Sequence, residues 1–124
     1  MEIKYLESEL FKKDFKKLLK RFRTLEEDLN TAKKAAIELF HLANIDNQSI
    51  VQISGFNHPE IKIYKLRKFA CKALKGRGAQ SGIRIIYAFN ESKSTVEFIE
   101  IYFKADQENE DKKRIEEWVR LNSG

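Results

Sequence analysis

The fold is decided by residues 83 to 104, which read IRIIYAFNESKSTVEFIEIYFK. Apolar side chains alternate with other residues in its first and last thirds, and this period of two is typical of β-strands, in which successive side chains point to opposite faces. Turn residues at 90 to 94 separate the two strands, so the segment predicts a β-hairpin. Its predicted apolar face comprises Ile83, Ile85, Tyr87, Phe89, Ile99, Ile101 and Phe103.

The preceding segment, residues 61 to 73, predicts a third strand with an irregularity. Apolar side chains occupy even positions up to Leu66 but odd positions from Phe69 onward. One extra residue near Arg67 and Lys68, a β-bulge, would restore a continuous apolar face. The opposite, open face of the sheet would then carry Lys65, Arg67, Lys72, Arg84, Glu100, Tyr102 and Lys104.

The N-terminal part predicts a short strand at residues 2 to 6, followed by two helices. From Ser8, which can cap a helix, apolar residues recur every three to four positions up to Phe22. A second stripe of this kind runs from Thr24, whose spacing to a following Glu is that of a capping box, to Ala43. The tight turn between the helices predicts an antiparallel helical hairpin.

Two segments complete the predicted order. Residues 44 to 60 are rich in Asn, Gly and Ser and predict a loop with a short extended piece at 50 to 53, and a last helix is expected from about 108 to 122. The order is strand, helix, helix, three strands, helix, within one domain of residues 1 to 124. We therefore expect an α+β fold with a mostly antiparallel sheet and the helical hairpin on one face.

Positive charge is concentrated in the strand region. Residues 61 to 90 contain eight basic side chains and no acidic one. Residues 61 to 104 hold ten basic and three acidic side chains, a net charge of +7, which exceeds the +5 of the whole chain. Lysines on an exposed sheet face have an alternative explanation, because they also discourage aggregation between sheet edges. The long run without acids and the arginine inside an apolar strand, Arg84, favour a surface that binds phosphate, such as a single-stranded RNA backbone.

Several other classes of function lack support in the sequence. The single cysteine, Cys71, is expected in the core, and it excludes an internal disulfide and fits a reducing compartment. Neither an apolar run long enough to span a membrane nor a secretory leader is present, so we expect a cytoplasmic protein without a membrane partner. His41 and His58 are isolated, and no cluster has metal-ligand spacing. The glycines of KGRGAQSG, residues 75 to 82, precede a strand, which excludes a nucleotide phosphate-binding loop, so no small-molecule cofactor is expected.

Four motifs stand in the second half of the chain. They are Lys-x-Arg at 65 to 67, Gly-Ile-Arg at 82 to 84, Ile-Tyr-Phe-Lys at 101 to 104, and a helix rich in Asp, Glu and Lys behind them. Together they resemble the RelE/ParE superfamily of toxins from type II toxin–antitoxin modules. The order of elements predicted above is also the order of that family.

The RelE branch implies ribosome-dependent, metal-independent cleavage of mRNA, in which a ribose 2′-OH attacks the adjacent phosphate. In this resemblance Arg84 grips the scissile phosphate, and Lys104 matches a basic position at the end of the last strand. Lys65, Arg67 and Lys72 are candidates for the general base and a backbone clamp, because a lysine crowded by like charges can have a lowered pKa. Further contacts with RNA are expected from Lys68, Lys75, Arg77 and Tyr102.

The chain departs from the family pattern in two places. Ala105 and Asp106 follow Lys104 where RelE toxins carry an arginine, and the final helix contains no tyrosine. Lys104, with Tyr102, would have to substitute. Two alternatives stay open, a ParE-like inhibitor of DNA gyrase without catalysis and a noncatalytic RNA-binding protein of this fold. The implied partners are an acidic antitoxin protein, the ribosome and mRNA.

Overall fold

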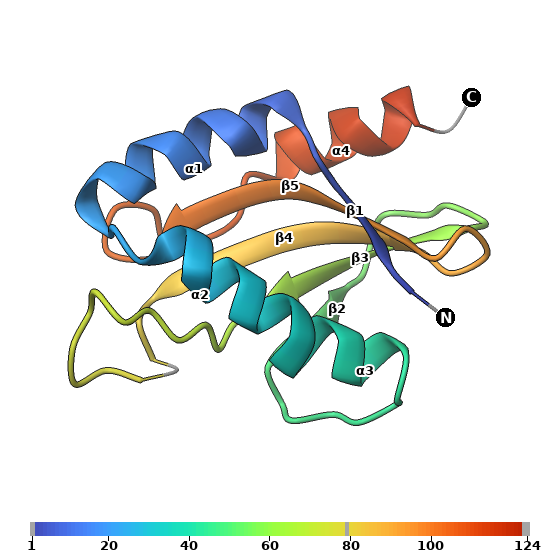
Figure 1. Cartoon of the computed structure of the whole chain (residues 1–124). Coiled ribbons are helices and arrows are strands. Elements are labelled where there is room, and N and C mark those ends of the chain that lie inside the picture. The colour runs from blue at the N-terminus through green and yellow to red at the C-terminus, as the bar shows by residue number, and fades with distance from the viewer. Residues whose placement is uncertain (1, 79, 123–124) are drawn as a thin grey trace.

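A five-stranded sheet lies between helices in the computed structural model, which describes residues 2–78 and 80–122 (Figure 1). The strands are β1 (Lys4–Glu7), β2 (Ile50–Ile53), β3 (Ile61–Leu66), β4 (Ile83–Asn90) and β5 (Thr95–Phe103). The helices are α1 (Glu9–Arg21), α2 (Leu25–Ala32), α3 (Leu39–His41) and α4 (Lys112–Leu121), and a π-helical segment (Lys33–Glu38) joins α2 to α3. The predicted order is confirmed, with β2 added at the short extended piece.

The strands lie in the order β1-β5-β4-β3-β2, and only β1 pairs in parallel, with β5. The predicted hairpin of β4 and β5 is confirmed. A bulge interrupts this pair where Ile86 faces Glu100 and Tyr87 faces Phe98, so that Ile99 is the extra residue. Phe98 therefore belongs to the apolar face of the hairpin, and the assignment of Ile99 to that face is wrong.

The strand predicted to run to residue 73 ends at Leu66, and no bulge occurs near Arg67 and Lys68. The backbone turns away because its amide groups bond to α2 instead of to a neighbouring strand. Lys72 N donates to an Asp28 carboxylate oxygen and Ala73 N donates to Thr24 Oγ1. Thr24 thus receives the loop rather than forming the predicted capping box, whereas Ser8 caps α1 as predicted, by accepting from Phe11 N.

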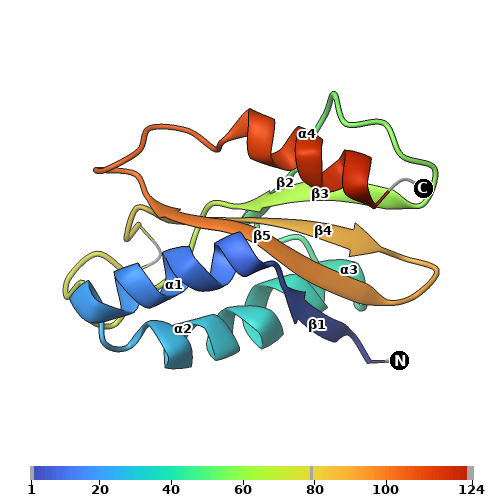
Figure 2. The ribbon, with the colours of Figure 1, turned by 90° about the horizontal axis from the view of Figure 1, so that it is seen from above.

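Each face of the sheet is covered by helix (Figure 2). The helical hairpin covers one face over a large core that includes Phe11, Leu25 and Tyr87. Helix α4 lies on the other face, where Ile115 is fully buried against Ile86 and four other residues, Ile63, Ala88, Ile99 and Tyr102. The open sheet face that the sequence predicted is therefore partly closed. Within residues 2–78 and 80–122, none of the helices combines the length and apolar character that crossing a bilayer requires.

Candidate nucleic-acid interface

A group of cations lies where β3, β4 and β5 meet beyond the N-terminal end of α4. Arg84 pairs with Tyr102 across β4 and β5, and Lys104 N donates to Gly82 O at 2.8 Å, which extends the same ladder by one pair. Because alternate residues of a strand share a face, Arg84, Tyr102 and Lys104 lie on one side of the sheet. This placement agrees with the predicted shared face of Arg84 and Lys104.

Arg67, the residue that follows β3, joins this group. Leu66 pairs with Ile85, so the next residue, Arg67, lies at the level of Arg84. Arg67 N donates to Ser49 O at 2.7 Å, which keeps its backbone in line with the β2–β3 pairing. Arg67 is exposed and Arg84 is half-buried. Among the described residues no carboxylate forms an ion pair with Arg67, Arg84 or Lys104, so this part of the surface keeps its positive charge.

Arg84 has a buried donor without an acceptor. Its Nε is shielded from solvent and has no hydrogen-bond partner within the described part of the chain. A buried donor left in this way costs about 1–3 kcal/mol. The neighbouring residues Ile83 and Ile85 are fully buried in the core under the helical hairpin, which fixes Arg84 on the opposite face. An anionic oxygen that bound beside this guanidinium would satisfy the donor.

Lys65 lies on the same face but is neutralised. Its Nζ is 2.8 Å from Oε1 of Glu110, in the segment that precedes α4, and the two side chains are only 15% and 12% exposed. Burial by itself lowers the pKa of Lys65, but the bonded Glu110 carboxylate and the nearby Tyr102 hydroxyl outweigh it and raise the pKa. The expectation of a lysine with a lowered pKa is therefore wrong for Lys65 in this conformation.

Tyr102 lies under the C-terminal segment, not on an open surface. It is 4% exposed and packs with Ile115. Its hydroxyl is buried without a hydrogen-bond partner among the described residues. Burial raises the pKa of Tyr102, and the adjacent Lys65 ammonium opposes that shift. A ring in this position cannot stack on a base unless the C-terminal segment moves.

Lys72 is separate from the group. Its Nζ bonds to Glu27 of α2 at 2.6 Å, and its backbone bonds to Asp28, so it lies with the helical hairpin. The prediction that Lys72 shares the face of Arg84 is wrong, because the chain leaves the sheet at Leu66. The other loop cations are exposed and unpaired within the described residues: Lys68, Lys75 and Arg77.

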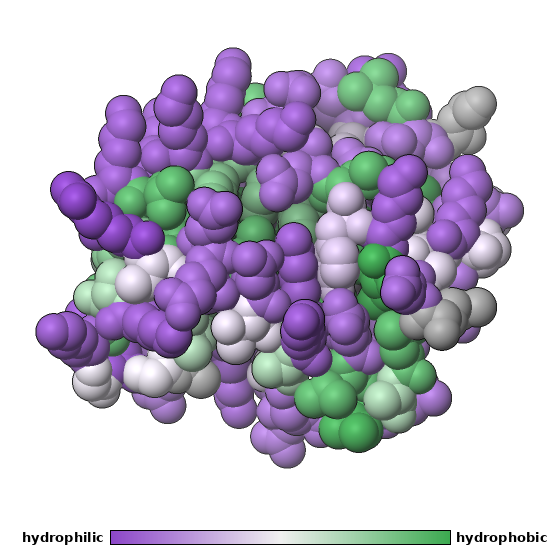
Figure 3. All heavy atoms as spheres, viewed as in Figure 1, coloured by the Kyte–Doolittle hydropathy of each residue, from purple (hydrophilic) through white to green (hydrophobic). Residues whose placement is uncertain are grey.

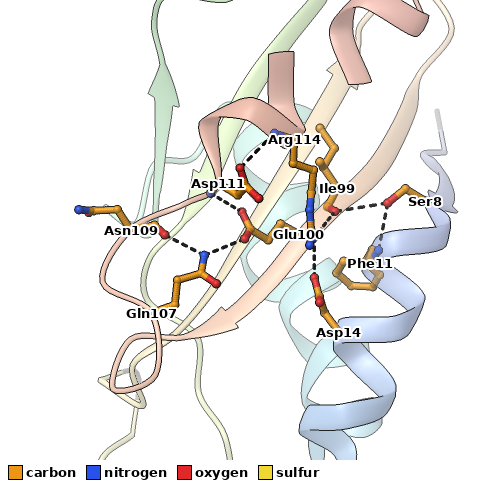
Figure 4. A network of polar contacts seen from close by, with 9 residues as sticks. All are labelled: Ser8, Phe11, Asp14, Ile99, Glu100, Gln107, Asn109, Asp111 and Arg114. Carbon is orange, nitrogen blue, oxygen red and sulfur yellow. Dashed lines mark hydrogen bonds and ion pairs between the residues drawn. The ribbon is translucent and has the colours of Figure 1, made fainter. Parts of the chain in front are cut away.

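A polar network holds the C-terminal segment against the sheet (Figure 4). Glu100, only 2% exposed, accepts hydrogen bonds from Gln107 Nε2 and from Asp111 N, and Asp111 in turn caps α4. Arg114 pairs with Asp14 of α1 and also donates to a β5 carbonyl. Burial raises the pKa of Glu100, and its two hydrogen bonds oppose the shift. This network was not predicted, because the alternation of the strand placed Glu100 on an open sheet face.

No group of three or more His, Cys, Asp or Glu side chains suited to a metal ion occurs within residues 2–78 and 80–122. The donor set around Arg84 consists of guanidinium and ammonium groups, which bind anions and not metal cations. This surface can therefore bind an anion by charge and by hydrogen bonds.

Comparison with known proteins identifies the fold. The structure is similar to one chain of the archaeal RelE–RelB complex from Pyrococcus horikoshii OT3, with a TM-score of 0.51 and 11% sequence identity over 84% of this chain and 97% of that chain. A second similar structure is the E. coli toxin RelE, a mutant in the free state, with a TM-score of 0.48 and 19% identity over 87% and 90% of the two chains. No family model and no curated protein matches the sequence. The chain thus has the RelE-like fold expected from its motifs.

Proposed function

We propose that this chain is the toxin of a type II toxin–antitoxin module and cleaves mRNA on the ribosome. The observation that carries the proposal is the set of three unpaired cations, Arg67, Arg84 and Lys104, on one side of a RelE-like sheet. Such a set fits one backbone phosphate with its neighbours, because guanidinium groups bind phosphate oxygens with two donors each. The likeness to a RelE chain supports the fold on which the set is placed.

In the proposed reaction the ribose 2′-OH attacks the adjacent phosphate, the 2′-proton passes to a base, and the leaving 5′-oxygen takes up a proton. Arg84 binds a non-bridging phosphate oxygen, and its charge stabilises the negative charge that builds up during attack. Arg67 and Lys104 bind the RNA backbone on either side of the phosphate that is cleaved. The charge of Lys65 is neutralised while it is bonded to Glu110, so Lys65 would serve as base only after that ion pair opens.

Burial lowers the pKa of Lys65, but the bonded Glu110 carboxylate outweighs burial and raises it. A lysine with a raised pKa is a poor base, which favours a second candidate, the noncatalytic RNA-binding protein. In that case the same cations bind phosphate and no side chain removes the 2′-proton. One measurement distinguishes the two candidate functions, namely whether the bound RNA is cut.

We further propose that an acidic antitoxin binds the surface around Arg84. The net charge of +7 on residues 61 to 104 would attract such a partner and speed association at low salt. Rim cations such as Lys75 and Arg77 would supply much of this attraction because they are exposed. Association measured by stopped flow should therefore slow markedly as salt is raised.

The proposal is tested with purified protein, programmed ribosomes and a defined mRNA. Wild-type protein is expected to cut the message. Arg84→Ala should reduce the rate about a hundredfold or more, the usual cost of losing a group that meets charge in the transition state. The control is Lys17→Ala, which removes an exposed cation of α1 and should leave the rate unchanged.

Three outcomes separate the candidates. RNA that binds and stays intact favours the noncatalytic protein. Inhibition of gyrase supercoiling with no effect on translation identifies the ParE-like activity. A rate for Arg84→Ala equal to that of wild type refutes the site, provided that circular dichroism shows both variants folded.

A further inference from the structure

A second site lies at the far end of the sheet from α4's N-terminus. A cavity of about 620 Å³ opens between α3, the start of β3 and the turn that joins β4 to β5. Its lining includes Phe40, His41, Lys62, Tyr64, Phe89 and Glu91. None of the residues proposed to bind RNA belongs to this set, so the inference below does not depend on the proposed function.

Aromatic rings form one wall of the cavity. The ring of His41 stacks on Phe89 with centroids 4.0 Å apart, and Tyr64 meets His41 and Phe40 edge to face at 4.7 and 5.8 Å. A ring nitrogen of His41 is 2.7 Å from the Tyr87 hydroxyl, which fixes the imidazole. Burial lowers the pKa of His41 to about 4, so this wall is uncharged at neutral pH.

One polar group of this wall has no partner. Tyr64 is 8% exposed, yet no described residue forms a hydrogen bond with its hydroxyl. Burial, together with the nearby Glu91 carboxylate, raises the pKa of Tyr64, which keeps the hydroxyl protonated. The described side-chain atoms that are shielded from solvent and lack a partner are Arg84 Nε and the Tyr102 hydroxyl, and the Tyr64 oxygen is not one of them. The Tyr64 oxygen is therefore accessible to a donor that enters the cavity.

The charged residues of the lining select for positive charge. Asp46, Glu60 and Glu91 contribute three carboxylates, against the single ammonium of Lys62. All four residues are exposed, and none of the ion pairs in the described structure involves them. Neutral aromatic faces beside carboxylates are the usual environment for an organic cation.

Exposed apolar side chains lie next to the lining residue Asn44 in the sequence. Figure 3 shows apolar surface over α3 and the chain beyond it, where Leu42 and Ile45 are 36% and 51% exposed. A small free ion would gain nothing from these side chains, whereas a peptide could place apolar side chains on them while a basic side chain enters.

We propose that this cavity binds the guanidinium or ammonium side chain of a partner polypeptide, with apolar residues of that polypeptide on Leu42 and Ile45. The cation would lie against the rings of Phe40 and Tyr64, donate to the Tyr64 hydroxyl, and face the Glu91 carboxylate. This basic partner is opposite in charge to the acidic antitoxin proposed for the surface around Arg84.

The experiment titrates the full chain with a blocked Leu-Ala-Arg-Ala-Leu peptide and follows backbone amide signals by NMR. The same peptide with citrulline in place of arginine is the matched probe, because it keeps the shape and loses the charge. We expect the arginine peptide to shift the signals of Phe40, Tyr64 and Glu91 and to bind at least about fivefold tighter than the citrulline peptide, the scale of one cation–aromatic contact plus a carboxylate.

The test variant is Glu60→Gln with Glu91→Gln, which should weaken binding of the arginine peptide by about threefold or more. Its control is Glu26→Gln with Glu116→Gln, which removes two exposed carboxylates elsewhere and should leave binding unchanged. All four positions are exposed, so both variants should fold.

Equal affinity of the arginine and citrulline peptides would overturn the proposal. So would an equal loss of binding in the control variant, because it would show only a dependence on net charge. If tetramethylammonium chloride produces the same shifts at the same concentration as the peptide, the occupant is a free cation and the polypeptide partner is refuted.

Discussion

Two ion pairs have similar lengths but differ in burial, so they test how burial sets the strength of charge interactions in this chain. Lys65 and Glu110 are 2.8 Å apart with side chains 15% and 12% exposed, whereas Lys72 and Glu27 are 2.6 Å apart with side chains 64% and 62% exposed. If distance alone set the strength, the Lys72–Glu27 pair would be the stronger one. Burial ranks the first pair higher, because water and salt screen an exposed pair.

We expect Glu110→Gln to lower the free energy of unfolding by about 1–3 kcal/mol, between the ~0.2–1 kcal/mol of exposed pairs and the ~3–5 kcal/mol lost when a buried pair is broken. The matched variant Glu27→Gln should cost less than about 1 kcal/mol. Both substitutions keep the size of the side chain and remove one charge, so the difference isolates the effect of burial on the ion pair.

The assay is urea unfolding followed by the fluorescence of Trp118, the single tryptophan, which lies on α4. The dependence of the free energy on urea should keep its slope in both variants. Equal losses for Glu110→Gln and Glu27→Gln, or a larger loss for Glu27→Gln, would refute the argument from burial.

The pH dependence has a definite sign. Burial acts against both charges, but the ion pair outweighs it, raising the pKa of Lys65 and lowering the pKa of Glu110. The stabilisation from Lys65 is complete below the ordinary lysine pKa and is lost as pH rises through the raised value. That from Glu110 is complete above the ordinary carboxyl pKa and is lost as pH falls through the lowered value. The difference between wild type and Glu110→Gln should therefore be constant near neutrality and shrink at both extremes.

Three further perturbations have expected outcomes. Because burial lowers the pKa of His41 from 6.5 to about 4, the free energy of unfolding should fall as pH drops through that range, and an NMR titration of the ring should have its midpoint near the lower value. Ile115→Ala should cost about 2–5 kcal/mol in urea unfolding, since the side chain is fully buried under α4, whereas Leu121→Ala, at 67% exposure, should cost less than about 0.5 kcal/mol. Gly82→Ala should lower the thermal midpoint, because φ is +86° and a Cβ would lie 3.3 Å from Phe103 Cε1; an unchanged midpoint would contradict this.

The sequence predicted the elements well because each carries its own period. The hairpin of β4 and β5 follows from alternation, and α1 from a stripe that begins after its cap, Ser8. The bulge in β5 was not predicted, because Phe98 and Ile99 are adjacent apolar residues and either could face the core until the partner strand fixes the register.

The candidate site was predicted only in part. Arg84 and Lys104 share a face because strand alternation is a local property. The burial of Tyr102 could not be read from the sequence, since the stripe of α4 shows that the helix packs but not on which face. Nor could the pairing of Lys65, whose partner lies 45 residues away. Lys72 was misplaced because side chains of α2, rather than any periodicity, turn its backbone out of the sheet.

The parallel pairing of β1 with β5 has a consequence for synthesis of the chain. Lys4 lies opposite Thr95, and the first helical hairpin packs on the sheet that these strands join. At about 5–20 residues per second, roughly 5 to 20 s pass between translation of the two partners. Until then α1 lacks β5, the strand on which it packs, although β2, β3 and β4 have already been translated. The nascent chain therefore stays incompletely folded, and its cations lack their final arrangement, until β5 has been translated.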